Sequence, residues 1–156
     1  MPEKQIHVDT GEGKVTNEPC ILESIGMGSC IAICLYDWEN KIAGMAHVLL
    51  GHNPESGLNP MRFADTAIDV LLRKMIEMGS KREHIQAKIF GGAELFKSKF
   101  FKVGEDNVKA VNEKLKSESI PIVAEDTGGH QGRNIWFDTT NGKVVVGKIF
   151  GPTKEY

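Results

Sequence analysis

The sequence predicts an α/β sandwich, in which helices cover a mixed, largely antiparallel sheet whose strands are linked by hairpins. Three observations favour this fold class. Short apolar runs rich in β-branched residues recur along the chain, turn residues join two pairs of these runs directly, and two segments between runs repeat apolar residues at helical spacing. No internal repeat or low-complexity linker divides the 156 residues, so we expect one domain over residues 1–156.

The predicted strands of the N-terminal half surround a glycine-bearing turn. Residues 21–25 and 30–36 are apolar runs on either side of this turn, and both have the composition of strands. A nearly continuous apolar run over residues 42–50 follows the turn residues 37–41. The second and third runs are therefore predicted to form a hairpin.

The helices are predicted from apolar residues that recur every three or four positions. One covers residues 62–78, begins after Asn59-Pro60 and ends at Gly79. The other covers residues 105–117 and carries charged residues opposite its apolar side. The remaining strands are predicted at residues 86–90 and 120–126 and in a closing antiparallel pair joined at Asn141-Gly142.

The composition excludes several classes of partner. A formal net charge of -2, with scattered Lys and Arg residues, provides no basic surface for a nucleic acid or an anionic membrane. The polar N-terminus is unlike a signal peptide, and no apolar stretch has the length of a membrane span. We therefore expect a cytoplasmic protein that binds no nucleic acid and does not insert into a membrane. Its three cysteines, an odd number, are expected to be free thiols.

Strand geometry brings one cysteine close to one histidine. If the hairpin closes over Glu39-Asn40, Ala32 lies opposite His47 on the neighbouring strand. Cys30 shares the face of Ala32, because side chains alternate faces with a period of two, so Cys30 and His47 become diagonal neighbours. Such positions are roughly 7–8 Å apart at the backbone, and two facing side chains can reduce that gap to hydrogen-bonding distance.

This pair has the chemistry of a cysteine nucleophile and its base. A free thiol has a pKa of about 8.5, and a neighbouring imidazolium lowers that pKa and favours the thiolate. We expect His47 to activate Cys30 in this way, and the backbone amides around Gly28 and Ser29 to form an oxyanion hole. Taken alone, however, a cysteine in an apolar strand is more often a buried hydrophobic residue than a nucleophile.

The other cysteines and histidines have weaker claims to a function. Cys34 shares the face of Cys30 but lies roughly 13 Å further along the strand, too far to bind one zinc ion with it, so no metal site is predicted. Cys20 lies outside the glycine-bearing turn and is expected to be packed or partly exposed. The remaining histidines lie in or beside polar stretches and are expected to be solvated or capping residues: His7, His52, His84 and His130.

Several segments, taken in order, resemble the CheD family. They are SIGMGSCIAICLYD, AGMAHVLL, KIFGGAELF, a DTGGHQGR loop followed by FDT, and a final VVVGKI, and they extend from about Glu23 to Ile149. CheD proteins are chemoreceptor glutamine deamidases of prokaryotic chemotaxis. The resemblance implies that Cys30 is the nucleophile and His47 the base. It also implies a third catalytic position at Ser24, where the family usually has a threonine, so that the hydroxyl is kept and the methyl group is lost.

The resemblance implies an activity and its partners as well. The implied reaction is hydrolysis of receptor glutamine side chains to glutamate through a thioester on Cys30, with no metal or organic cofactor. The implied substrates are the methyl-accepting chemotaxis receptors, and relatives also bind CheC-type phosphatases. The residues alone leave alternatives open: a non-catalytic module that binds receptors or a phosphatase, a redox-sensing thiol, or a cysteine protease or transglutaminase.

Overall fold

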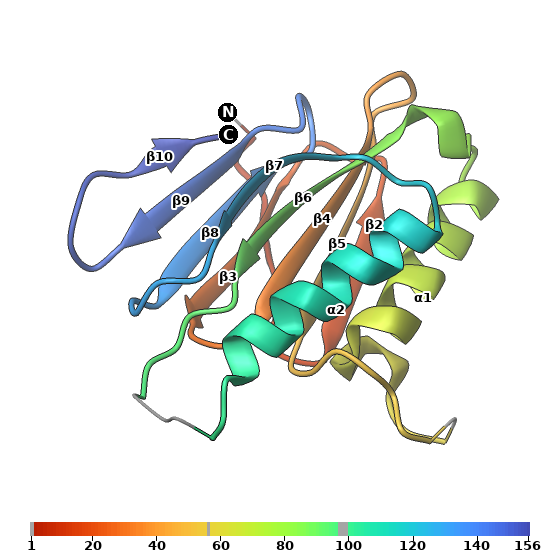
Figure 1. Cartoon of the computed structure of the whole chain (residues 1–156). Coiled ribbons are helices and arrows are strands. Elements are labelled where there is room, and N and C mark those ends of the chain that lie inside the picture. The colour runs from red at the N-terminus through yellow and green to blue at the C-terminus, as the bar shows by residue number, and fades with distance from the viewer. Residues whose placement is uncertain (1, 56, 97–99) are drawn as a thin grey trace.

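The protein is built from three layers, seen in a computed structural model that describes residues 2–55, 57–96 and 100–156 (Figure 1). Two five-stranded sheets pack face to face, and the helices α1 and α2 cover the outer face of one of them. Within these residues, neither helix has the length and apolar character needed to traverse a lipid bilayer. The predicted α/β class with mostly antiparallel strands is confirmed, but the strands form two sheets where a single sheet was expected.

Most neighbouring strands within each sheet are antiparallel. The first sheet has the order β1 (Gln5–His7), β3 (Ile21–Met27), β8 (Arg133–Asp138), β9 (Val144–Lys148) and β10 (Lys154–Glu155). The second has the order β2 (Glu12–Thr16), β5 (Ile42–Val48), β4 (Ile31–Asp37), β6 (Ile85–Gly91) and β7 (Ile122–Thr127). The two parallel pairings are β1 with β3 and β6 with β7. The chain passes from the first sheet to the second in the short turn between β3 and β4.

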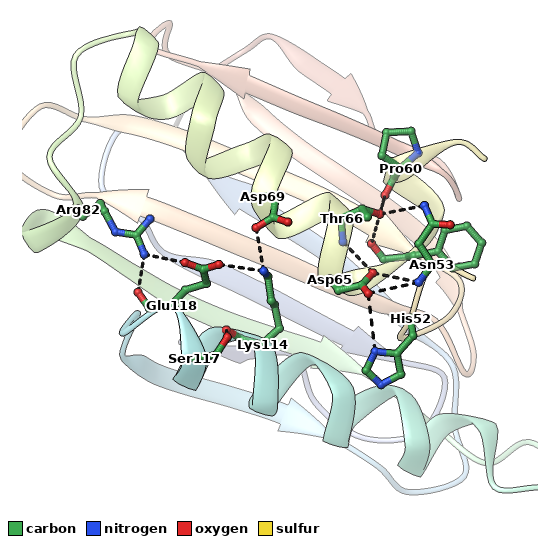
Figure 2. Close-up of polar contacts among 11 residues, drawn as sticks. His52, Asn53, Pro60, Asp65, Thr66, Asp69, Arg82, Lys114, Ser117 and Glu118 are labelled. Atoms are coloured by element: carbon green, nitrogen blue, oxygen red, sulfur yellow. Dashed lines mark hydrogen bonds and ion pairs between the residues drawn. The ribbon is translucent and has the colours of Figure 1, made fainter. Parts of the chain in front are cut away.

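The two helices close one side of the molecule. The 3-10 turn Pro60–Arg62 leads into α1 (Ala64–Glu77), a second 3-10 turn, Arg82–His84, leads into β6, and α2 (Val103–Ser117) precedes β7. Figure 2 shows how ion pairs join these elements at the surface: Lys114 on α2 contacts Asp69 on α1 at 2.8 Å and Glu118 at 2.8 Å, and Glu118 also contacts Arg82 at 2.9 Å.

Each of the two interfaces between layers contains its own apolar core. The core beneath the helices includes Ile33 and Leu35 of β4 together with Leu71 and Met75 of α1. The core between the sheets is formed by residues such as Leu22, Met45, Phe90 and Phe137. The second sheet is therefore apolar on both faces, which explains why β4 and β5 are nearly continuous apolar runs.

Candidate active site

The predicted hairpin register is confirmed. β4 and β5 pair with Ala32 opposite His47, which places His47 on the face that looks toward the other sheet. Cys30 immediately precedes β4 and packs against the same core between the sheets, where it is partly exposed, whereas His47 is buried. The cysteine and the histidine thus lie on one side of the hairpin, at the edge of the space between the two sheets.

Two hydrogen bonds orient the imidazole of His47. Its Nδ1 lies 3.2 Å from the carbonyl oxygen of Val8, and its Nε2 lies 3.3 Å from the hydroxyl of Thr10. Both partners belong to the segment between β1 and β2. Burial lowers the pKa of His47 below its ordinary value, although the hydrogen bond to Val8 partly opposes this. The resting imidazole is therefore neutral near pH 7.

Ser24 reaches the site from the opposite sheet. It is a fully buried residue of β3, and its hydroxyl donates a hydrogen bond of 2.7 Å to the carbonyl of Val8. Because Nδ1 of His47 contacts the same carbonyl, Ser24 and His47 are linked through the backbone of Val8. Among the described residues, no direct hydrogen bond joins the two side chains.

The pKa of the Cys30 thiol is shifted upward, opposite to the direction expected from a neighbouring imidazolium. Burial raises the pKa of its thiol above the ordinary value, and hydrogen bonds with the Thr10 side chain and with its own backbone amide only partly oppose this. Since the pKa of His47 is lowered at the same time, the neutral thiol and neutral imidazole are the favoured resting pair.

The turn before Cys30 is shaped by two glycines with different roles. Gly26 has a positive φ of 68°, which glycine adopts without strain. Gly28 does not have a positive φ. A Cβ atom at this position would lie 2.6 Å from Cδ1 of Leu95, so the absence of a side chain leaves room for Leu95.

Hydrogen bonds to this turn fix the direction of its peptide groups. The carbonyl of Gly28 accepts from the amide of Ala93 at 3.0 Å, and the carbonyl of Ser29 accepts from the side chain of Asn107 at 2.9 Å. In a trans peptide the N–H points away from the C=O of the same unit. The amides of Ser29 and Cys30 therefore point away from Ala93 and Asn107.

Two glycine-rich loops contact the turn, one at the end of β6 and one after β7. The carbonyl of Cys30 accepts a hydrogen bond of 2.9 Å from the amide of Gly92. Gly91 has to be a glycine, because a Cβ atom there would lie 2.2 Å from the carbonyl oxygen of Cys30. The loop after β7 is joined to the same place, since the amide of Gly128 donates to Gly91 and the amide of Glu94 donates to Gly129. The loop Gly128–Arg133 (GGHQGR) thus lies beside the candidate site.

Asn107 connects the segment before Cys30 with the segment after His47, and it was not predicted from the sequence. This buried residue of α2 donates one N–H of its side chain to the carbonyl of Ser29 and one to the carbonyl of Leu49, each at 2.9 Å. Ser29 precedes Cys30, and Leu49 follows His47 by two residues. The available signal was a polar residue on the apolar side of the helix, in line with Val111.

Replacing Asn107 with alanine is expected to lower both stability and activity. The substitution leaves two carbonyls without their donor, which costs about 1–2 kcal/mol of the free energy of unfolding. It also frees the backbone on either side of the catalytic pair. Denaturant unfolding and deamidation rates measure the two effects. Asn112→Ala is the matched control, because within the described residues its side chain donates a hydrogen bond to Val108 of the same helix. An equal loss in both variants would contradict the proposed role of Asn107.

Among the described residues, no hydrogen bond brings the remaining cysteines and histidines together with Cys30 and His47, although His130 belongs to the loop beside the candidate site. Cys20 and Cys34 are buried, and burial raises the pKa of both thiols. Each of the other histidines contacts a glutamate or an aspartate residue: His7 pairs with Glu23, His52 with Asp65, and His84 with Glu39, while Nδ1 of His130 contacts the carbonyl oxygen of Glu94. Figure 2 shows His52 turned toward Asp65 at the start of α1.

A cavity opens next to Ser29, the residue before Cys30. It has a volume of about 290 Å³ and is lined by Ser29, Ala93, Glu94, Leu95, Phe96, Phe101 and Val103. Leu95, Phe96 and Phe101 are exposed at 51%, 83% and 73%, respectively, although large apolar side chains are usually covered. The candidate active site is therefore bordered by an apolar surface.

Fold and site together define an α/β sandwich protein with a cysteine and a histidine paired at the edge between two sheets. A profile described as "CheD chemotactic sensory transduction" matches residues 50–148. Proteins named "Probable chemoreceptor glutamine deamidase CheD" from Clostridium botulinum strains Hall and Langeland are each 42% identical to the chain over 99% of both sequences. A protein of the same name from Caldanaerobacter subterraneus subsp. tengcongensis is 41% identical over 96% of both sequences. The chain belongs to the CheD family.

Proposed function

We propose that this protein is a glutamine deamidase that hydrolyses glutamine side chains of chemotaxis receptors to glutamate. The observation that carries the proposal is the position of Cys30 and His47 on the same side of the β4–β5 hairpin, where Cys30 immediately precedes β4, in a chain of the CheD family. The names of the relatives supply the proposed substrate, and the geometry supports Cys30 as the proposed nucleophile and His47 as the proposed base. The active unit is taken to be one domain formed by residues 1–156.

The proposed reaction proceeds through a thioester. Cys30 loses its proton to His47, and its sulfur attacks the side-chain carbonyl carbon of a glutamine. The oxygen of the resulting tetrahedral intermediate is held by backbone amides of the turn, with Gly28 and Ser29 as the candidates named from the sequence and the Cys30 amide added from the peptide directions. His47 then protonates the departing ammonia, and a water molecule hydrolyses the thioester to release glutamate.

Ser24 has an indirect part in this proposal. Its hydroxyl holds the carbonyl of Val8, and that carbonyl in turn fixes Nδ1 of His47. Ser24 is therefore a positioning residue that acts on the base through the backbone. The mechanism needs no metal ion or organic cofactor, because the thiol, the imidazole and the backbone amides provide each of its steps.

The apolar surface around the cavity favours a protein partner at the site. Leu95, Phe96 and Phe101 border the cavity beside Ser29, where a receptor helix would contact the enzyme while it presents a glutamine. The same surface supports a second candidate function, in which the protein binds receptors or a CheC-type phosphatase as a regulatory module without chemistry.

Incubation with a purified cytoplasmic receptor fragment separates these two functions. Mass spectrometry detects the replacement of a side-chain NH₂ by OH at individual glutamines, and a binding assay on the same mixture detects the complex. We expect glutamate to appear at specific sites, and no change with heat-denatured protein. Binding of the fragment without any conversion would refute the deamidase proposal in favour of the regulatory module.

A further inference from the structure

A hydroxyl group lies between the two proposed catalytic side chains, and it comes from a part of the chain for which no role was predicted. Thr10 belongs to the short connection between β1 and β2, which lies across β5 because the amide of Gly11 donates a hydrogen bond of 2.8 Å to the carbonyl of His47. This bond and the adjoining pairing of Glu12 with His47 fix the position of Thr10 over the imidazole.

The hydrogen bonds of His47 determine which ring nitrogen carries the proton. Nδ1 contacts the carbonyl of Val8 at 3.2 Å, and a carbonyl can only accept, so Nδ1 is the protonated nitrogen of the neutral ring. Nε2 is then an acceptor. Its partner at 3.3 Å is the hydroxyl of Thr10, which therefore donates its hydrogen to Nε2.

The same hydroxyl also interacts with the nucleophile. The Thr10 side chain acts to lower the pKa of the Cys30 thiol, which burial raises, so its hydroxyl faces the sulfur as well as the imidazole. Because the hydrogen of the Thr10 hydroxyl is directed to Nε2, its oxygen lone pairs remain to accept the S–H of the neutral thiol. Among the described residues, no hydrogen bond joins the thiol directly to the imidazole. The path from nucleophile to base therefore leads from the S–H of Cys30 through the hydroxyl of Thr10 to Nε2 of His47.

We propose that Thr10 is a catalytic residue that carries the proton from the sulfur of Cys30 to Nε2 of His47. The inference rests on the proposed deamidase function and deepens its first step. When the sulfur attacks the glutamine carbonyl, the thiol proton moves to Oγ1 of Thr10 as the hydroxyl proton moves to Nε2. The products are a sulfur bonded to carbon, an unchanged hydroxyl and an imidazolium. No proton or electron pair is left over.

This role differs from that of Ser24, which is the hydroxyl implied by the family resemblance. Ser24 donates to the backbone of Val8, on the Nδ1 side of the ring, and does not reach the proton that moves. Thr10 lies on the Nε2 side, between the reacting atoms. It is also an exposed residue, so its substitution leaves both apolar cores intact.

The test compares Thr10→Val with Thr10→Ser. Valine keeps the shape of threonine without the hydroxyl, and serine keeps the hydroxyl without the methyl group. Two rates are measured: deamidation of the receptor fragment, and alkylation of Cys30 by iodoacetamide between pH 6 and pH 10 (about the range in which thiols titrate). The second rate involves no receptor, so it tests the relay even if the receptor is not a substrate. Thr16→Val, at the end of β2, the strand that follows Thr10, is the control.

We expect Thr10→Val to lower the deamidation rate on the order of 10²-fold, the size of a general acid–base contribution. We also expect its alkylation profile to move to higher pH, because the thiolate loses a hydrogen-bond donor. Thr10→Ser should restore most of both properties, and Thr16→Val should resemble the wild type. The proposal is overturned if Thr10→Val keeps the wild-type rates, if serine fails to rescue the folded protein, or if deamidation falls while the alkylation profile stays unchanged.

Discussion

Replacement of Cys30 with alanine is expected to abolish glutamine deamidation while the protein remains folded. Removal of the nucleophile prevents formation of the thioester, and losses of this kind are typically about 10⁴-fold or more. Cys30 is only partly buried at the edge of the inter-sheet core, so the smaller side chain leaves little empty volume. The rate is measured by mass spectrometry on the receptor fragment, and folding by denaturant unfolding.

Cys34→Ala is the matched control for this prediction. Cys34 lies on the same face of the hairpin as Cys30, four residues further along, but it is fully buried and burial raises the pKa of its thiol. Its loss should reduce stability through a small cavity without removing activity. If Cys30→Ala retained most of the wild-type rate, or if Cys34→Ala lost activity to the same extent, the assignment of the nucleophile would be wrong.

Replacement of Arg133 with methionine is expected to cause the largest loss of stability among the polar substitutions considered. Arg133 is 3% exposed and contacts Asp126, itself 10% exposed, at 3.0 Å. It also donates to the carbonyls of Gly91 and Gly128. Removing one partner of a buried ion pair costs about 3–5 kcal/mol. We expect the lower end of this range, because Lys148 still contacts Asp126.

The loss caused by Arg133→Met should depend on pH. Burial alone would raise the pKa of Asp126, but hydrogen bonds from Tyr156, Lys148 and Arg133 hold it below its ordinary value. The stability that this carboxylate contributes is present above the ordinary aspartate pKa and is lost as the pH falls through the lowered pKa of the folded protein. The difference between variant and wild type should therefore be full at pH 7 and shrink in acid.

Unfolding free energies at neutral and acidic pH measure this effect. Lys148→Met is the control, since Lys148 contacts the same carboxylate at 3.2 Å from a more exposed position and should cost less than about 1 kcal/mol. Similar losses in the two variants would show that the buried position of Arg133 has no special importance. Because Gly91 lies against the carbonyl of Cys30, the arginine variant should also be less active at temperatures where it is folded.

The hairpin that carries the candidate catalytic pair could be predicted because the residues that determine it lie close together in the sequence. The turn residues between two apolar runs fix the pairing of Ala32 with His47, and the period of two then decides which side chains share a face. The long helix α1 was predicted for a similar reason, since its apolar spacing and Gly79 lie within one segment. These features depend on neighbours in the sequence.

The N-terminal strands could not be predicted in this way. β1 and β2 are short, mostly exposed edge strands without alternating apolar residues, and their stability comes from pairing with β3 and β5. β10 is shorter still and pairs with β9. Because β1 and β2 were not expected, the segment between them could not be placed over His47, and Thr10 was not recognised. Asn107 was missed for the same reason, since its partners are distant in sequence.

The passage of the chain from one sheet to the other has a consequence for the durability of the enzyme. Ser24 belongs to the strand before that crossing, Cys30 is the last residue of the turn, and His47 is held by a carbonyl that Ser24 fixes from the first sheet. Any sliding of one sheet over the other would break the link from Ser24 through Val8 to Nδ1 of His47, and so release the base from its orientation, before either sheet lost a strand. Activity therefore depends on the packing between the two sheets. Side chains buried far from Cys30 contribute in this way to the highest temperature at which the enzyme remains active.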